Sequence, residues 1–214
     1  EVLAPVLVDR REHHAALDVN ALPGFMSALR EQQGLGAKAL EFLVLTAARS
    51  GEVRGATWGE IDLDNAVWTI PAERMKAGRE HRVPLSAPAI KLLRALPRIE
   101  GADLLFPSTR NTPLSDMTLT AVMRRMGSDA VPHGFRSTFR DWAAERTNFP
   151  REVAEMALAH TIESKVEAAY RRGDLFEKRR RMMNEWAKFC DSTASTGARV
   201  VALVHAAARP GRHV

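Results

Sequence analysis

The segment Ala37–Ala48 constrains the fold more than any other part of the sequence. It is dominated by large apolar side chains, among them Leu40, Phe42, Leu43, Val44 and Leu45. A helix that is apolar on every side is stable only when other elements cover it on every side. We therefore predict that this segment forms a helix buried in the core.

The hydrophobic periodicity changes from helical to alternating in the next part of the chain. Residues 61–63 and 67–70 alternate between apolar and polar side chains, which is typical of strands. Asp64-Asn65 fits a tight turn between them, and a polar turn at 74–80 leads to a third short strand at 81–85. The pattern predicts a three-stranded antiparallel sheet, which is too small to be stable without helices packed on it.

Helical spacing of apolar residues dominates the rest of the sequence. It predicts helices at 23–33, 51–56, 87–96, 116–126, 134–147, 151–159, 163–171 and 175–189. Phe135, Phe139 and Trp142 have the spacing of one helix face, so we expect them to be buried. The fold class that follows is α+β and mainly α-helical, a helical bundle with a small three-stranded antiparallel sheet.

Composition divides the sequence into three parts. Residues 1–19 include a charged cluster and fit a linker, residues 20–190 hold the predicted elements, and residues 191–214 form a Ser/Thr/Ala-rich tail. The chain begins with Glu1 instead of Met and has no signal-peptide pattern. We therefore expect it to be the C-terminal piece of a longer protein.

Charge and cysteine content narrow the range of partners. The net charge of +5 and the pI of about 9.9 favour a polyanionic partner, either nucleic acid or an anionic membrane surface. Cys190 is the only cysteine, which excludes an intramolecular disulfide and favours a reducing, cytoplasmic setting. No apolar run is long enough to cross a bilayer. His13 and His14 have no acidic or Cys ligand cluster beside them, so we expect no metal site.

Two pairs of residues stand where a charge needs a partner or a ligand. Arg49 directly follows the apolar helix, and Glu52 is its obvious partner three residues later. His133 and Arg136 share one side of the first turn of a predicted helix, whose N-terminal N–H groups attract anions. Each pair fits an internal role, a salt bridge or a helix cap, and also a functional role in binding a phosphate.

Three further residues are ambiguous when each is taken alone. Lys76 lies in the polar turn between the second and third strands, where lysines are usually solvated. His160 ends a predicted helix, where the helix dipole suffices to account for a histidine. Tyr170 is the only tyrosine of the chain, and a lone tyrosine is usually a packing residue.

In chain order, these residues resemble the tyrosine recombinase (phage integrase) family. Ala47–Val53 is similar to the family's first arginine box, 75–86 to its strand lysine region, and His133–Arg136 to its His-x-x-Arg box. Leu-Ala-His at 158–160 stands where the family often has Leu-Gly-His, and Tyr170 follows ten residues later, as the family expects. The likeness is strongest to integrases of prophages and genomic islands.

The resemblance implies the catalytic-domain architecture of DNA breaking-rejoining enzymes for residues 20–190. Residues 1–19 would then be a linker from a missing N-terminal core-binding domain. The sequence departs from the family at Ala47 and Ala159, where relatives often have Gly, and at Gly51. These departures leave the charged positions intact.

The resemblance also assigns a role to each residue. Arg49 and Arg136 would bind the two non-bridging oxygens of the scissile phosphate, and Tyr170 would attack it to form a 3′-phosphotyrosine. His133 would be the general base and Lys76 the general acid. His160 would add a hydrogen bond to the phosphate, and Glu52 would orient the basic groups. No cofactor and no metal are expected.

The implied partner is double-stranded DNA, bound by a homo-tetramer on paired sites in a bacterial cytoplasm, and no membrane. The implied activity is site-specific integration or excision of a mobile element. There are two alternatives. The chain could relax DNA in the manner of a type IB topoisomerase, or it could be a DNA-binding relative that has lost catalysis. We further expect residues 175–214 to dock on a neighbouring copy, because the tail contains the apolar residues Val200, Val201, Leu203 and Val204.

Several other basic residues are candidates for contacts with DNA phosphates. One group lies close together in the sequence: Arg171, Arg172, Lys178, Arg179, Arg180 and Arg181. A solvated helix face accounts for this group equally well. The other candidates are scattered: Arg74, Arg79, Arg82, Arg124 and Arg125.

Overall fold

A computed structural model describes residues 15–160 and 173–193 of the chain. The described part is mainly helical with one three-stranded antiparallel sheet, which confirms the predicted fold class. The helix predicted at 163–171 lies outside the described residues.

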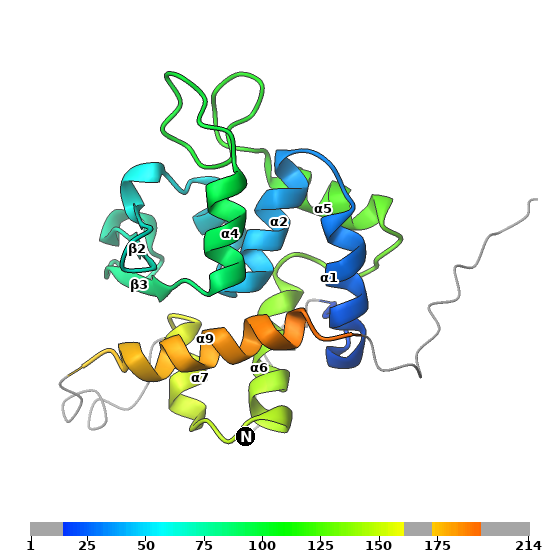
Figure 1. Ribbon diagram of the computed structural model, residues 1–214, viewed down its shortest axis with the longest axis vertical. Helices are drawn as coiled ribbons and strands as arrows, with labels where there is room; N and C mark the ends of the chain where they lie inside the picture. The colour runs from blue at the N-terminus through cyan, green and yellow to red at the C-terminus, as the bar shows by residue number, and fades with distance from the viewer. Residues whose placement is uncertain (1–14, 161–172, 194–214) are drawn as a thin grey trace, which may run out of the picture.

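Helix α2 (Leu35–Thr46) lies at the centre of the domain, as its composition predicts (Figure 1). It is surrounded by α1 (Leu22–Arg30), α4 (Ala87–Ala95), α5 (Asp116–Arg125) and α9 (Phe176–Cys190). Its buried apolar side chains include Leu40, Phe42, Leu43, Val44 and Leu45. The burial of this helix supplies much of the hydrophobic stabilisation of the domain.

The sheet lies beside α4 and is formed by β1 (Ile61–Asp62), β2 (Val67–Ile70) and β3 (His81–Pro84) (Figure 1). The predicted tight turn at Asp64-Asn65 is a four-residue loop instead, because Asp62 pairs with Val67. The Asp62 carboxylate accepts hydrogen bonds from the main-chain N of Asp64 and of Asn65, at 3.1 and 2.8 Å. A side-chain acceptor of this kind stabilises a turn without help from the sheet.

Helix α9 joins the two sides of the domain. It runs across α2, α7 (Arg151–Ala157) and β3 (Figure 1). Trp186 on α9 donates a hydrogen bond from Nε1 to the carbonyl oxygen of Val44, at 2.7 Å, and its ring lies 5.2 Å from Phe139. Phe139 belongs to α6 (Gly134–Arg146), whose predicted aromatic face is buried.

The ends of α2 differ by two residues from the prediction, for a reason that lies in the backbone. Gly34 precedes the helix with φ of 92°, a conformation that favours glycine, and the helix begins immediately after it. Ala47 ends the helix in the left-handed region, with φ of 51°. Only glycine adopts that conformation without strain, so an alanine there gave no signal for a helix end.

Residues 15–17 of the predicted linker cross the beginning of α6. The carbonyl oxygen of Ala15 accepts a hydrogen bond from the main-chain N of Val131, and that of Leu17 accepts one from Thr138 Oγ1 at 2.7 Å. A Cβ atom at Gly134 would lie 2.2 Å from the oxygen of Ala15. Glycine is therefore required at the first residue of α6 by the close approach of another main chain.

We predict that Gly134→Ala lowers the free energy of unfolding by about 1–3 kcal/mol, because the added methyl forces the two main chains apart. Gly24→Ala in α1 is the matched control, since a Cβ there meets no atom within 4 Å. The control is expected to be neutral or stabilising by up to about 1 kcal/mol. Urea unfolding of both variants measures the difference, and equal stabilities would contradict the crossing at Gly134.

Candidate functional site

Arg49 and Glu52 form the first part of the candidate site. Arg49 is the N-cap residue of α3 (Ser50–Arg54). Glu52 accepts hydrogen bonds from the main-chain N of Arg49 at 2.8 Å and from its Nη1 at 2.7 Å. The Glu52 side chain is 6% exposed, so the predicted salt bridge is present and holds the guanidinium in one orientation.

Arg136 is a cation inside the core, with 4% of the residue exposed. Its Nη1 donates to the carbonyl oxygen of Ala47 at 2.7 Å, and its Nη2 donates to that of Leu158 at 2.5 Å. Ala47 and Leu158 cap the C-terminal ends of α2 and α7. Carbonyl groups at helix C-termini carry partial negative charge, so two helix ends stabilise the buried guanidinium.

His160 follows the end of α7 and joins Arg136 to Glu155. Its Nδ1 lies 2.6 Å from Oε2 of Glu155, and its Nε2 lies 3.1 Å from Nη2 of Arg136. Burial lowers the pKa of His160, and the positive charges of Arg136 and Arg49 lower it further, against the opposing effect of Glu155. Ala159, immediately before it, has φ of 49°, in the left-handed region.

These groups influence one another electrostatically. Burial, and then the charge of Arg49, lower the pKa of Arg136 to about 10, while Glu52 and Glu155 oppose the shift. A pKa of about 10 leaves Arg136 charged at neutral pH. The structure thus brings together Arg49, Glu52, Arg136 and His160, which come from three separate parts of the chain.

His81, at the beginning of β3, lies against this cluster and was not identified from the sequence. It lines an enclosed space too small for water, together with Glu52, Arg136 and Leu158. Burial, and then the charge of Arg179, lower the pKa of His81 to about 4. His81 is therefore neutral at neutral pH. The available signal was a histidine at the beginning of a predicted strand that continues into the apolar residues Val83 and Leu85.

The other predicted site residues lie at the surface or outside the described part. Lys76 lies in the predicted turn before β3 and is exposed. His133 is the N-cap residue of α6 and is exposed, one turn from the buried Arg136. Tyr170 lies outside the described residues, so its position stays a prediction.

Two arginines predicted as DNA contacts are engaged inside the domain instead. Arg179 is 1% exposed and donates to the carbonyl oxygen and to the carboxylate of Asp174, both at 2.7 Å. The sequence-based alternatives for Arg179, a phosphate contact or a solvated face, are both wrong because the side chain is buried. Arg74 contacts the carboxylate of Glu60 and the main-chain oxygen of Glu52.

Glu155 is a second residue that was not identified from the sequence. Its side chain is 17% exposed, and Oε1 lies 3.0 Å from Nε of Arg140 and 3.6 Å from Nε of Arg151. The contact with Arg140 lacks hydrogen-bond geometry, so it is an ion pair only. An acidic residue five positions before His160 was the available signal, and such a spacing is not specific.

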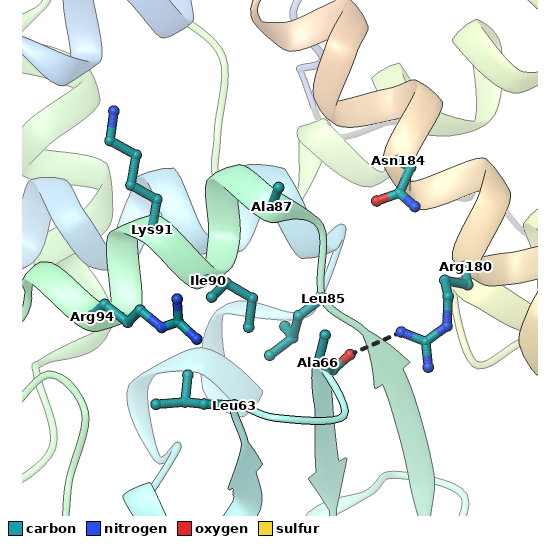
Figure 2. Close-up of a pocket in the computed structure, with 9 residues that line it drawn as sticks. All are labelled: Leu63, Ala66, Leu85, Ala87, Ile90, Lys91, Arg94, Arg180 and Asn184. Carbon is teal, nitrogen blue, oxygen red and sulfur yellow. Dashed lines mark hydrogen bonds between the residues drawn. The ribbon is translucent and has the colours of Figure 1, made fainter.

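An open groove of about 530 Å³ lies elsewhere, between the β1–β2 loop, α4 and α9 (Figure 2). Its floor is apolar, and Lys91, Arg94 and Arg180 lie around it. Arg180 donates from Nη1 to the carbonyl oxygen of Ala66 at 3.5 Å (Figure 2). None of the predicted catalytic residues lines this groove, so it is separate from the cluster around Arg136.

Three other features of the described residues bear on the predictions. Among residues 15–160 and 173–193, no three His, Cys, Asp or Glu side chains are grouped so that they could hold a metal ion. In the same part of the chain, no helix has the length and apolar character needed to cross a membrane. Cys190 is buried, and burial raises the pKa of its thiol well above the usual range.

Comparison with known proteins identifies relatives over most of the chain. The model of the phage integrase family matches residues 16–175. Prophage integrase IntA of Escherichia coli K12 is 41% identical over 149 residues, which are 67% of this chain and 36% of that protein. The integrase of Enterobacteria phage P4 is 33% identical over 204 residues, which are 85% of this chain and 46% of that protein. The chain thus spans less than half the length of these two relatives.

Solved structures of lambda integrase have a similar fold at low sequence identity. A lambda integrase(75-356) dimer bound to a COC' core site matches with a TM-score of 0.54 and 20% identity, over 71% of this chain and 59% of that chain. A lambda integrase tetramer bound to a Holliday junction matches with a TM-score of 0.52 and 20% identity, over 72% of this chain and 47% of that one. These matches confirm the predicted architecture.

The low pKa of His81 predicts how stability depends on pH. The unfolded chain takes up a proton at this residue near pH 6.5, whereas the folded protein does so only near pH 4. Stability is therefore lost as pH falls from 6.5 toward 4. Between pH 7 and pH 5, we expect the free energy of unfolding to fall by about 1–2 kcal/mol more in the wild type than in His81→Gln. Urea unfolding at both pH values measures this, and equal losses would contradict a neutral His81 in the folded protein.

Proposed function

Because the chain belongs to the phage integrase family, we propose that it is the catalytic part of a site-specific DNA recombinase. The enzyme would integrate or excise a mobile element through a 3′-phosphotyrosine intermediate. The observation that carries this proposal is the pairing of two fixed guanidinium groups, Arg49 and Arg136, beside one imidazole. A phosphodiester resists attack because of its negative charge, and two fixed cations offset that charge.

The two arginines are proposed to bind the non-bridging oxygens of the scissile phosphate. Glu52 takes one side-chain hydrogen bond from Arg49, and a guanidinium has five N–H donors. Arg136 is oriented by the carbonyl oxygens of Ala47 and Leu158. Both cations are held before DNA binds, so little reorganisation is needed when charge develops in the transition state.

The bond-making steps are assigned to Tyr170, His133 and Lys76. The phenol oxygen of Tyr170 would attack phosphorus, and the bond from phosphorus to the DNA 5′-oxygen would break. His133 would accept the phenol proton, and Lys76 would donate a proton to the departing 5′-oxygen. His160 would add a hydrogen bond to the phosphate. Lys76 and His133 are exposed whereas Arg136 is buried, which supports this division of roles.

The proposed partner is double-stranded DNA, and the proposed assembly is a tetramer on paired sites in the bacterial cytoplasm. The lambda integrase structures with the same fold are a dimer bound to a core site and a tetramer bound to a Holliday junction. The net charge of +5 is consistent with a polyanionic partner. Assembly on DNA would bring two cleaved strands together, so that each 5′-hydroxyl attacks the other phosphotyrosine.

The expected docking segment, residues 175–214, includes α9, which packs into its own domain. Met182, Met183 and Trp186 of this helix are buried in the core of their own chain. Residues 194–214 lie outside the described residues. We therefore confine the proposed docking segment to 194–214.

The proposed activity can be tested without knowledge of the target sequence. Nicked duplexes tiled across the DNA that flanks the gene should yield a covalent adduct on a denaturing gel, because the nick releases the attacking 5′-end. Mass spectrometry should locate the DNA on Tyr170, and Tyr170→Phe should form no adduct. The absence of any adduct from a folded wild-type chain that binds the duplexes would exclude strand cleavage.

Arg49→Ala is expected to slow adduct formation by about 10²–10³-fold, the cost of removing one donor to a developing anion. Arg49→Lys keeps the charge but loses the planar fork, so we expect an intermediate rate. Single-turnover kinetics on the captured duplex measure both rates. Thermal unfolding serves as the control for folding, because the salt bridge to Glu52 is lost in the alanine variant.

Deletion of residues 194–214 is expected to reduce the size of the complex on DNA, because the apolar residues in this segment would no longer reach a neighbour. Sedimentation velocity with the captured duplex measures the complex. A full-length variant in which the four apolar residues are changed to serine should give the same result. These residues are Val200, Val201, Leu203 and Val204. Assemblies of unchanged size in both variants would contradict the proposal.

A further inference from the structure

Glu155 contacts His160 at two points. The main-chain N of His160 donates to the carbonyl oxygen of Glu155 at 2.9 Å, and its Nδ1 lies 2.6 Å from Oε2 of the same residue. The Glu155 side chain is 17% exposed and the His160 side chain is 38% exposed. The imidazole is therefore held in one orientation by a single acidic residue.

The other ring nitrogen of His160 identifies its tautomer. Nη2 of Arg136 lies 3.1 Å from Nε2 of His160. A guanidinium donates hydrogen bonds and does not accept them, so Nε2 is the acceptor and carries no hydrogen. The proton of the neutral ring is on Nδ1, which donates to Glu155.

This tautomer restricts what His160 is able to do toward an anion. A ring nitrogen without hydrogen presents a lone pair and cannot donate a hydrogen bond to a phosphate oxygen. Nε2 becomes a donor only when it takes up a proton and the ring becomes an imidazolium ion. A nearby anion and the carboxylate of Glu155 both favour that charged form.

We propose that Glu155 is a positioning residue of the phosphate site, which holds His160 in the Nδ1–H form and supports uptake of one proton at Nε2 when an anion enters. The proton comes from water or buffer, and no covalent bond changes. His160 turns from an acceptor for Arg136 into a donor to the anion. The N–H of Arg136 Nη2 that pointed at His160 then becomes free to donate to the anion, while the hydrogen bond from Nη2 to Leu158 remains. The inference rests on the proposed function only for the identity of the anion as a DNA phosphate.

The charges that face His160 set the balance between its neutral and charged forms. Burial lowers the pKa of His160 most, and the charges of Arg136 on α6 and Arg49 before α3 disfavour the imidazolium further. Arg140 on α6 and Arg151 on α7 pair with Glu155 and weaken its negative field. Without an anion the pKa of His160 is lowered by burial and by the charges of Arg136 and Arg49, which favours the neutral ring.

The proposal predicts the direction in which the affinity for an anion changes with pH. An anion raises the pKa of His160, so anion binding takes up a proton in the interval between the lower, anion-free pKa and the higher, anion-bound pKa. Anion affinity should therefore rise as pH falls through that interval and level off below it. Across the interval the affinity changes by at most about tenfold per pH unit, since one proton is involved.

Sulfate is a suitable probe, because it mimics a phosphate and does not titrate near neutral pH. Long-range 1H–15N correlation spectra of the full chain, labelled at histidine, report which ring nitrogen of His160 carries hydrogen. Without sulfate we expect hydrogen on Nδ1 and none on Nε2. Sulfate, compared with chloride at equal ionic strength, should raise the pH midpoint for protonation of Nε2 by about one unit.

Two variants with opposite expected shifts test the role of Glu155. Glu155→Gln keeps an oxygen that accepts from Nδ1 but removes the charge, so the midpoint should fall by about one unit and sulfate affinity between the midpoints by about tenfold. Arg140→Gln removes a cation from the other carboxylate oxygen, so its midpoint should stay the same or rise. Arg140 is 47% exposed at its side chain, and its loss should leave the fold intact.

Three results would each overturn the inference: hydrogen on Nε2 in the sulfate-free wild type, no effect of sulfate on the midpoint, or equal midpoints in the wild type and Glu155→Gln. If Glu155→Gln does not fold, a lower protonation midpoint in Arg140→Gln than in the wild type would overturn the inference instead. None of these measurements requires DNA cleavage. A chain that forms no adduct at Tyr170 but shows the expected shifts would refute the proposed function and leave the inference about Glu155 in place.

Discussion

The buried guanidinium of Arg136 is the interaction on which the rest of the site depends. Removing a cation from water costs several kcal/mol, and that cost is offset only by well-placed acceptors. The acceptors here are main-chain carbonyl oxygens at the C-terminal ends of α2 and α7. Three helices, including α6 that carries Arg136, are thereby connected at one point. The same hydrogen bonds that hold the helices together also orient the cation.

A second cation beside Arg136 would be unfavourable without a nearby negative charge. Arg49 is held by Glu52, whose carboxylate also favours the charged form of Arg136. The cluster therefore keeps two positive charges close together in the absence of any ligand, with Glu52 and Glu155 as the offsetting anions. An incoming phosphate would relieve the remaining repulsion, which makes anion binding favourable before any chemistry begins.

Local features of the fold could be predicted from the sequence, whereas distant contacts could not. Periodicity and apolar content are properties of neighbouring residues, so α2 and the three strands were identified with small errors at their ends. Arg179 illustrates the limit, because its burial depends on Asp174 and on the main chain of β3. The grouping of Arg49 with Arg136 came from a family resemblance and not from spacing. Glu155 was missed because its importance depends on the orientation of one side chain.

Ala47 and Ala159 both have positive φ, at two turns that flank Arg136. The left-handed conformation costs roughly 1–2 kcal/mol for a residue with a Cβ, and it aims the adjoining peptide groups at the site. Relatives with glycine at these positions would avoid that strain. A β-branched side chain would be far more costly than alanine at 47 and 159. The two turns next to the buried cation thus tolerate fewer replacements than the helices they terminate.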